Sequence, residues 1–98
     1  MITSKQRAFL RGKANDLDAI FQIGKDGINE NMIAQLDDVL EARELIKIKV
    51  LETAMLTARE ASEAVCAATG AEPVQCIGSK FVIYRPNSEK PVIILPKA

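Results

Sequence analysis

The chain has 98 residues, enough for one domain, and its 13 basic and 13 acidic side chains give a formal net charge of zero. With 48% hydrophobic and 27% charged residues, the composition is that of a globular protein and excludes a disordered or fibrous one. No run approaches the roughly 20 apolar residues that span a bilayer. The N-terminal segment also lacks the apolar core of a signal peptide, so we expect a cytoplasmic protein that does not interact with membranes.

The first expected element is a helix that begins after Thr3 and runs to about Lys13. Thr3-Ser4-Lys5-Gln6 has the form of a capping box, in which the first and last side chains bond to each other's backbone N–H. This segment carries four basic side chains and no acidic one: Lys5, Arg7, Arg11 and Lys13. A neutral chain can therefore present one basic face, although an ordinary solvated helix face explains the same charges.

The next segment predicts a strand, a tight loop, a helix and a second strand. The apolar run 19–23 indicates the first strand, and two glycines mark the loop 24–27 that follows it. Asn29 is suited to cap a helix whose apolar residues keep helical spacing up to position 40. Residues 45–51 alternate apolar and lysine side chains, which predicts a strand with both lysines on one face.

The second half of the chain predicts a further helix and a β-hairpin. Thr57-Ala58-Arg59-Glu60 is another capping box and opens an alanine-rich helix that ends near Gly70. Residues 74–77 and 81–84 flank a Gly-Ser turn and form the expected hairpin. In the proline-punctuated remainder, residues 92–95 fit either an edge strand or an extended tail.

The predicted order is an N-terminal helix followed by β-α-β-α-β-β. Alternating strands and helices favour an α/β fold with parallel strand pairs and right-handed crossovers, and the final hairpin makes the sheet mixed. We therefore expect a two-layer sandwich with a mixed sheet of about four strands. One domain should span residues 1–98, with its core at about 4–86 and an extended C-terminal tail at 87–98.

The side chains that usually carry catalysis are scarce. The chain has no histidine, which removes the commonest general base and the nucleophile pairs that depend on it. Cys66 and Cys76 lack metal-ligand spacing and are expected to be small buried apolar residues. The acidic residues fall mostly at solvated helix positions. We therefore expect a protein that is not an enzyme, with no catalytic residue, metal, cofactor or small-molecule substrate.

The loop Gly24-Lys25-Asp26-Gly27 is the sharpest candidate for a binding site. It lies between a predicted strand and a predicted helix, where free helix N–H groups and the helix dipole favour an anion. Two glycines let backbone approach a ligand closely, as in the GXXG loop that clamps nucleic acid in KH domains, and Lys25 would add a phosphate contact. A plain turn with glycines in unusual dihedral angles explains the same residues. The pattern alone leaves both interpretations open.

Four segments in order resemble successive signatures of the CRM domain, the chloroplast RNA splicing and ribosome maturation domain, in its bacterial stand-alone YhbY form. They are Gln6-Arg7-Ala8-Phe9-Leu10-Arg11, Ile23-Gly24-Lys25-Asp26-Gly27-Ile28, Glu44-Leu45-Ile46-Lys47-Ile48-Lys49-Val50 and Ile77-Gly78-Ser79-Lys80-Phe81-Val82-Ile83-Tyr84-Arg85. The resemblance extends from about Ser4 to Pro86. It favours the binding interpretation of the GXXG loop over the plain turn.

The resemblance implies a fold similar to the C-terminal domain of translation initiation factor three, and binding to ribosomal RNA in precursors of the large ribosomal subunit during their assembly. It implies that the GXXG backbone and Lys25 hold the RNA backbone, with Asp26 pointing away. Positive charge would come from Lys5, Arg7, Arg11 and Lys13, with Arg85 as a further contact. We expect a monomer. The alternative is a protein-interaction module whose acidic helix, at about 30–41, contacts a ribosomal protein or an assembly enzyme.

Overall fold

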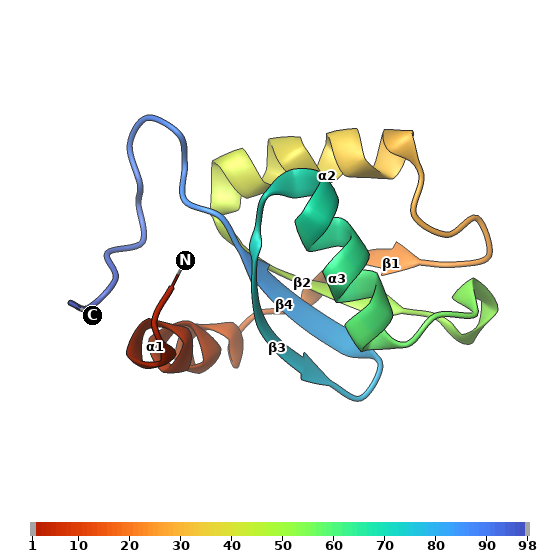
Figure 1. The fold of residues 1–98 in the computed structure, drawn as a ribbon, viewed down its shortest axis with the longest axis horizontal. Coiled ribbons are helices and arrows are strands. Elements are labelled where there is room, and N and C mark those ends of the chain that lie inside the picture. Colours follow the sequence, from red (N-terminus) through yellow and green to blue (C-terminus); the bar gives the residue numbers. More distant parts are fainter. Residues whose placement is uncertain (1, 98) are drawn as a thin grey trace.

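The computed structural model describes residues 2–97, and its elements follow the predicted order (Figure 1). In chain order they are α1 (Ser4–Ala14), β1 (Ala19–Ile23), α2 (Glu30–Arg43), β2 (Leu45–Val50), the short 3-10 helix η1 (Glu52–Ala54), α3 (Ala58–Thr69), β3 (Glu72–Ile77) and β4 (Lys80–Tyr84). Only the single turn η1 was absent from the sequence-based expectation.

The four strands form one mixed sheet in the order β1-β2-β4-β3. β1 and β2 are parallel, whereas β4 pairs antiparallel with both β2 and β3. The last strand of the chain is therefore inserted between two earlier ones. The predicted α/β class and mixed four-stranded sheet are confirmed.

The main core lies between the sheet and the two helices α2 and α3, which cover the same face (Figure 1). Strand alternation puts Ile46, Ile48 and Val50 of β2 on this face. They pack with Leu36 of α2 and Val65 of α3, both fully buried. Each such side chain contributes roughly 1.5–3 kcal/mol by leaving water, so this layer dominates the stability of the fold.

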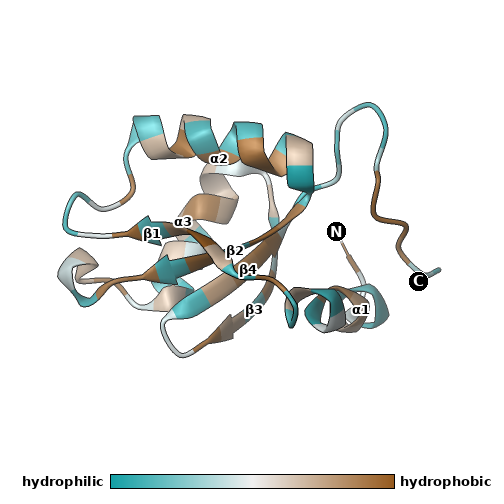
Figure 2. Cartoon of the chain, turned by 180° about the vertical axis from the view of Figure 1, so that it is seen from behind, coloured by the Kyte–Doolittle hydropathy of each residue, from teal (hydrophilic) through white to brown (hydrophobic). Residues whose placement is uncertain are grey.

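Helix α1 lies on the opposite face of the sheet, at one end (Figure 2). It buries Leu10 and Ala14 against Val74, Val82 and Tyr84 in a second, smaller cluster. Phe9, which precedes Leu10 in the helix, is 40% exposed. Helix α1 thus adds a partial layer to the predicted sandwich and leaves the rest of this sheet face uncovered by any helix.

The helix starts agree with the predicted caps. Thr3 and Thr57 each form a complete capping box with the glutamine or glutamate three residues later. Asn29 accepts a hydrogen bond from the Met32 N–H at 2.9 Å. These local bonds satisfy helix amides that have no partner inside the helix, which is why the boundaries can be predicted from sequence.

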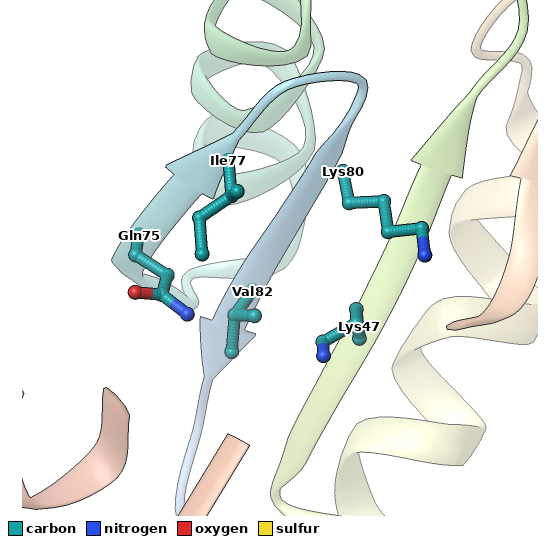
Figure 3. A pocket seen from close by; sticks show the side chains of 5 residues that line it. All are labelled: Lys47, Gln75, Ile77, Lys80 and Val82. Atoms are coloured by element: carbon teal, nitrogen blue, oxygen red, sulfur yellow. The ribbon is translucent and has the colours of Figure 1, made fainter. Parts of the chain in front are cut away.

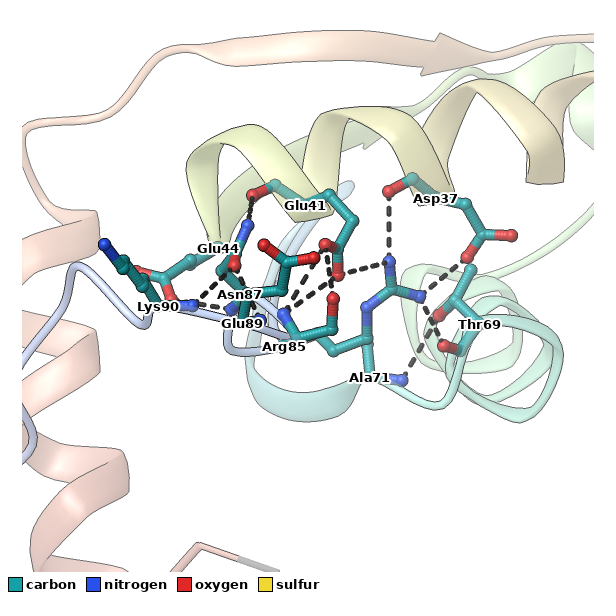
Figure 4. Close-up of polar contacts among 10 residues, drawn as sticks. Asp37, Glu41, Glu44, Thr69, Ala71, Arg85, Asn87, Glu89 and Lys90 are labelled. Carbon is teal, nitrogen blue, oxygen red and sulfur yellow. Dashed lines mark hydrogen bonds and ion pairs between the residues drawn. The ribbon is translucent and has the colours of Figure 1, made fainter.

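After Asn87 the described chain contains no helix or strand and is held by Glu44. Glu44 is 1% exposed and has φ of +66°, a strained value for a residue with a side chain. Its carboxylate accepts an N–H bond from Asn87 at 2.8 Å (Figure 4). It also accepts N–H bonds from Val92 at 2.9 Å and Ile93 at 2.6 Å. Ile93 and Leu95 then pack against the second cluster. The tail is thus extended and docked, and residues 92–95 form no edge strand.

The pKa of Glu44 reflects two opposing effects. Burial acts to raise the pKa, and the three backbone N–H donors that point at the carboxylate outweigh it, so the net pKa is below its ordinary value. The side chain is therefore ionised at neutral pH and serves as the anchor of the tail.

Candidate nucleic-acid interface

The loop between β1 and α2 is a hydrogen-bonded turn. The Gly27 N–H donates to the Gly24 carbonyl oxygen at 2.9 Å, which closes the turn around Lys25 and Asp26. Gly27 has φ of +66°, in the left-handed region that glycine adopts without strain. A Cβ on Gly24 would lie 3.6 Å from the side chains of Leu51 and Thr53, an ordinary contact. Only the second glycine is thus required by backbone conformation.

The turn opens onto a hollow of about 250 Å³ in front of the N-terminus of α2. Lys25 is exposed at its rim, and the cap provided by Asn29 uses the Met32 amide but not the two amides before it. Asp26 and Glu30 place two carboxylates in the same region. The turn therefore offers accessible backbone and the amine of Lys25. The carboxylates of Asp26 and Glu30 outweigh that one positive charge, so the local net charge does not favour an anion.

The basic side chains of α1 lie at the other end of the molecule. Figures 1 and 2 both place α1 and the β1–α2 loop at opposite ends of the longest dimension, which is 39 Å. Arg7 donates to the Pro73 carbonyl oxygen at 3.1 Å, and the Lys13 amine lies 5.7 Å from the centre of the Phe9 ring. Lys5 and Arg11 are exposed. Arg7 and Arg11 lie one turn apart on α1, whereas Lys5 and Lys13 point in other directions. The fold does not bring these basic residues next to the GXXG turn.

Arg85 is bound within the protein. Its guanidinium donates to the Asp37 carboxylate at 2.7 Å, to the Thr69 carbonyl oxygen at 2.7 Å and to the Asp37 carbonyl oxygen at 3.0 Å (Figure 4). Glu41 completes the cluster at 3.7 Å. Arg85 thus ties the end of β4 to α2 and α3, and it lies at the end of the sheet away from the GXXG turn (Figure 1).

Three lysines on the uncovered part of the sheet were not among the predicted site residues. Lys47 and Lys49 of β2 point away from α2 and α3, because their neighbours Ile46, Ile48 and Val50 occupy that side. Lys80 of β4 lies directly opposite Lys49. The alternating pattern of β2 already indicates that Lys47 and Lys49 share one face of the strand. The position of Lys80 beside them depends on the pairing of β4 with β2, which the sequence does not show. These amines occupy the surface between the GXXG turn and α1.

The two cysteines differ in burial. Cys66 is half-buried, and burial raises its pKa to about 11. Cys76 is exposed, so the expectation that it is buried was wrong. Within residues 2–97 no group of three or more His, Cys, Asp or Glu side chains is arranged to hold a metal ion. No helix of this described part is long and apolar enough to cross a membrane.

Comparisons with known proteins agree along nearly the whole chain. The family model of the CRS1 / YhbY (CRM) domain matches residues 2–85. "Probable RNA-binding protein YqeI" of Bacillus subtilis is 45% identical over 96 residues, covering 98% of this chain and 100% of that protein. An "RNA-binding protein" of Haemophilus influenzae is 36% identical over 96 residues, covering 98% and 96%. The solution structure of the hypothetical protein SAV1595 from Staphylococcus aureus matches with a TM-score of 0.77 and 50% identity, covering 98% and 100%.

Proposed function

The chain belongs to the CRS1/YhbY (CRM) domain family, and we propose that it binds structured RNA and assists assembly of the large ribosomal subunit. Its relatives in Bacillus subtilis and Haemophilus influenzae are named as RNA-binding proteins. In this proposal the protein acts as a cytoplasmic monomer without catalysis, and its partner is ribosomal RNA in a precursor of the large subunit.

The observation that carries the proposal is the GXXG turn at the start of α2. Gly27 brings unobstructed backbone to the surface, and Lys25 stands exposed beside two helix amides outside the Asn29 cap. Backbone amides at a helix N-terminus bind phosphate oxygens because they offer donors and a favourable dipole. The turn therefore serves as the point at which the RNA backbone is held.

Because Asp26 and Glu30 offset the charge of Lys25, the remaining positive charge has to come from elsewhere on the protein. Helix α1 supplies it through the exposed Lys5, Arg11 and Lys13 and the half-buried Arg7. The separation between α1 and the turn means that a bound RNA spans most of the molecule. Contacts with phosphates release counterions, so the affinity should fall steeply as the salt concentration rises.

Sedimentation of cell lysate through sucrose gradients at low and moderate salt tests this proposal. We expect the protein to sediment with large-subunit precursors at low salt and to leave them as salt rises. Lys25→Glu and Gly27→Asp should reduce sedimentation with the particles, whereas Lys90→Glu, a matched charge reversal on the exposed tail, should not. A wild-type protein that remains in the top fractions at low salt would refute the ribosomal role.

The alternative, a protein-interaction module acting through the acidic helix, has less support. Asp37 and Glu41 of α2 are bound to Arg85, and Glu41 also accepts hydrogen bonds from the Ser88 backbone and hydroxyl. Much of the negative face of α2 is thus used inside the protein. Charge reversal at Asp38, which is exposed and unpaired among the described contacts, tests the alternative without disturbing that cluster.

A further inference from the structure

The part of the sheet that α1 leaves uncovered forms a surface with a distinct composition. We define this open sheet face by six residues of three strands: Lys47, Lys49, Gln75, Ile77, Lys80 and Val82. It lies opposite α2 and α3, and Figure 3 shows five of these side chains on the same side of the sheet. Within residues 2–97 no helix lies over its lysines, Gln75 or Ile77, whereas Val82 is only 1% exposed beneath its neighbours.

The charge of the open sheet face is unbalanced. The side-chain amines of Lys47, Lys49 and Lys80 form no hydrogen bond or ion pair within residues 2–97. Lys49 and Lys80 are direct cross-strand neighbours, an arrangement that destabilises a sheet because like charges repel. Asp16 and Asp18 lie near Lys47 in an adjacent hollow, but they form no ion pair with it. A polyanion would relieve this repulsion.

A hollow of about 190 Å³ lies at the centre of the open sheet face (Figure 3). Val82 and Ile77 supply its apolar surface, Gln75 supplies an amide, and the amines of Lys47 and Lys80 stand beside it. Its lining includes no carboxylate. Ile77 is 61% exposed, so its apolar surface is accessible to a ligand. The hollow thus combines an apolar floor, one hydrogen-bonding group and positive charge.

The open sheet face is also in line with the GXXG turn. Lys49 is the pairing partner of Gln22, which lies two residues before the first glycine of the turn. β1 ends at the turn, and α1 packs on the same side of the sheet at its other end. A strand of RNA held at the turn and extending toward α1 therefore crosses this face.

We propose that the open sheet face binds a single-stranded segment of RNA and receives one unpaired base in its hollow. The base lies on the exposed side chain of Ile77, and the Gln75 amide contacts the base edge. Lys47, Lys49 and Lys80 contact the neighbouring phosphates. A duplex keeps its bases inside and shows only phosphates and ribose hydroxyls, which would leave the apolar floor and the amide unused. This inference rests on the proposed RNA binding and specifies the form of RNA that the protein recognises.

The test uses fluorescence anisotropy with the full chain and two probes, an unstructured single-stranded RNA and a blunt RNA duplex. We expect Ile77→Ser to weaken binding of the single strand about fivefold, because roughly 1 kcal/mol of apolar contact with the base is lost, and to leave duplex binding unchanged. Replacing the three lysines with glutamine should lower the salt slope for the single strand by about 2, since each phosphate contact contributes about 0.7. Lys90→Gln is the matched control.

The outcomes separate this inference from the proposed function. If Lys25→Glu abolishes binding while the Ile77 and lysine variants bind the single strand like the wild type, the protein binds RNA but not through this face. Equal losses for the single strand and the duplex would refute the base site. If the wild type binds neither probe, both proposals fail. Ile77 is exposed on an edge strand and Gln75→Ala is an independent variant of the same site, so a folding defect in one variant does not decide the result.

Discussion

Replacing Arg85 with alanine is expected to lower the free energy of unfolding while leaving the RNA affinity of the folded protein unchanged. The guanidinium joins three elements: it follows β4, and it donates to Asp37 on α2 and to the last carbonyl of α3, that of Thr69. The guanidinium N–H groups that could bind a phosphate are therefore already used by Asp37 and Thr69. The substitution therefore distinguishes a structural arginine from one that contacts RNA.

The magnitude follows from the contacts. Three hydrogen bonds of 2.7–3.0 Å are lost, along with a 3.7 Å ion pair. Charged hydrogen bonds contribute about 1.5–3 kcal/mol each when buried. Arg85 is only 20% exposed, but the side chains of Asp37 and Glu41 are 45% and 41% exposed, so water screens and replaces part of the interaction. We take about 1 kcal/mol for each hydrogen bond and expect a total loss of about 3 kcal/mol.

In a domain of this size, 1 kcal/mol shifts the melting temperature by about 4–8 °C, so Arg85→Ala should melt about 12–24 °C below the wild type. Circular dichroism measures the melting, and RNA affinity is measured well below the transition. Arg85→Lys keeps the charge but cannot reproduce the forked contacts, so it should also lose stability. An unchanged melting temperature, or a loss of affinity in folded Arg85→Ala as large as that in Lys25→Glu, would refute the reasoning.

Two further predictions concern Glu44 and the cysteines. Glu44→Gln should speed hydrogen exchange at the Val92 and Ile93 amides, measured by NMR, because the carboxylate that holds them is lost. The folded pKa of Glu44 is depressed, so its contribution to stability is full above the unfolded value of about 4.3 and is lost as pH falls through the lower folded value. In Glu44→Gln, the part of the loss of unfolding free energy at low pH that comes from protonation of Glu44 should be absent. With a thiol reagent at pH 8, Cys76 should react quickly and Cys66, whose pKa is about 11, slowly; equal rates would contradict the assigned burial.

The fold could be predicted where the signals are local. Capping boxes at Thr3 and Thr57 and the cap at Asn29 are short-range bonds written into a few adjacent residues. Alternation in β2 likewise assigned the two faces of the strand. The mixed sheet followed from the order of elements because parallel pairs need crossovers and the hairpin supplies an antiparallel pair.

The candidate site was harder to predict because its assignment depends on partners that are distant in sequence. In the sequence, nothing distinguishes Arg85 from any other basic residue at the end of a hairpin. Its partner Asp37 lies 48 positions earlier, and only the folded structure shows the two side chains in contact. Lys80 becomes a candidate binding residue only once the strand pairing places it opposite Lys49. The helical face of α1 was also uncertain, since Phe9 and Leu10 are adjacent and only one of them can point at the sheet. A sequence pattern shows which side chains share one face of a helix or strand, whereas tertiary packing decides which of those faces is buried.

The position of β4 has a consequence for how the protein is made. β4 is the last strand to be synthesised, yet it separates β2 from β3 and pairs with both. A nascent chain that stops before Lys80 has β1 and β2 as one pair and β3 without a neighbour, so the sheet cannot close. Folding must therefore wait for nearly the whole chain and for contacts distant in sequence, which slows it. A chain truncated before the hairpin turn would expose unpaired strand edges, a recognised cause of aggregation.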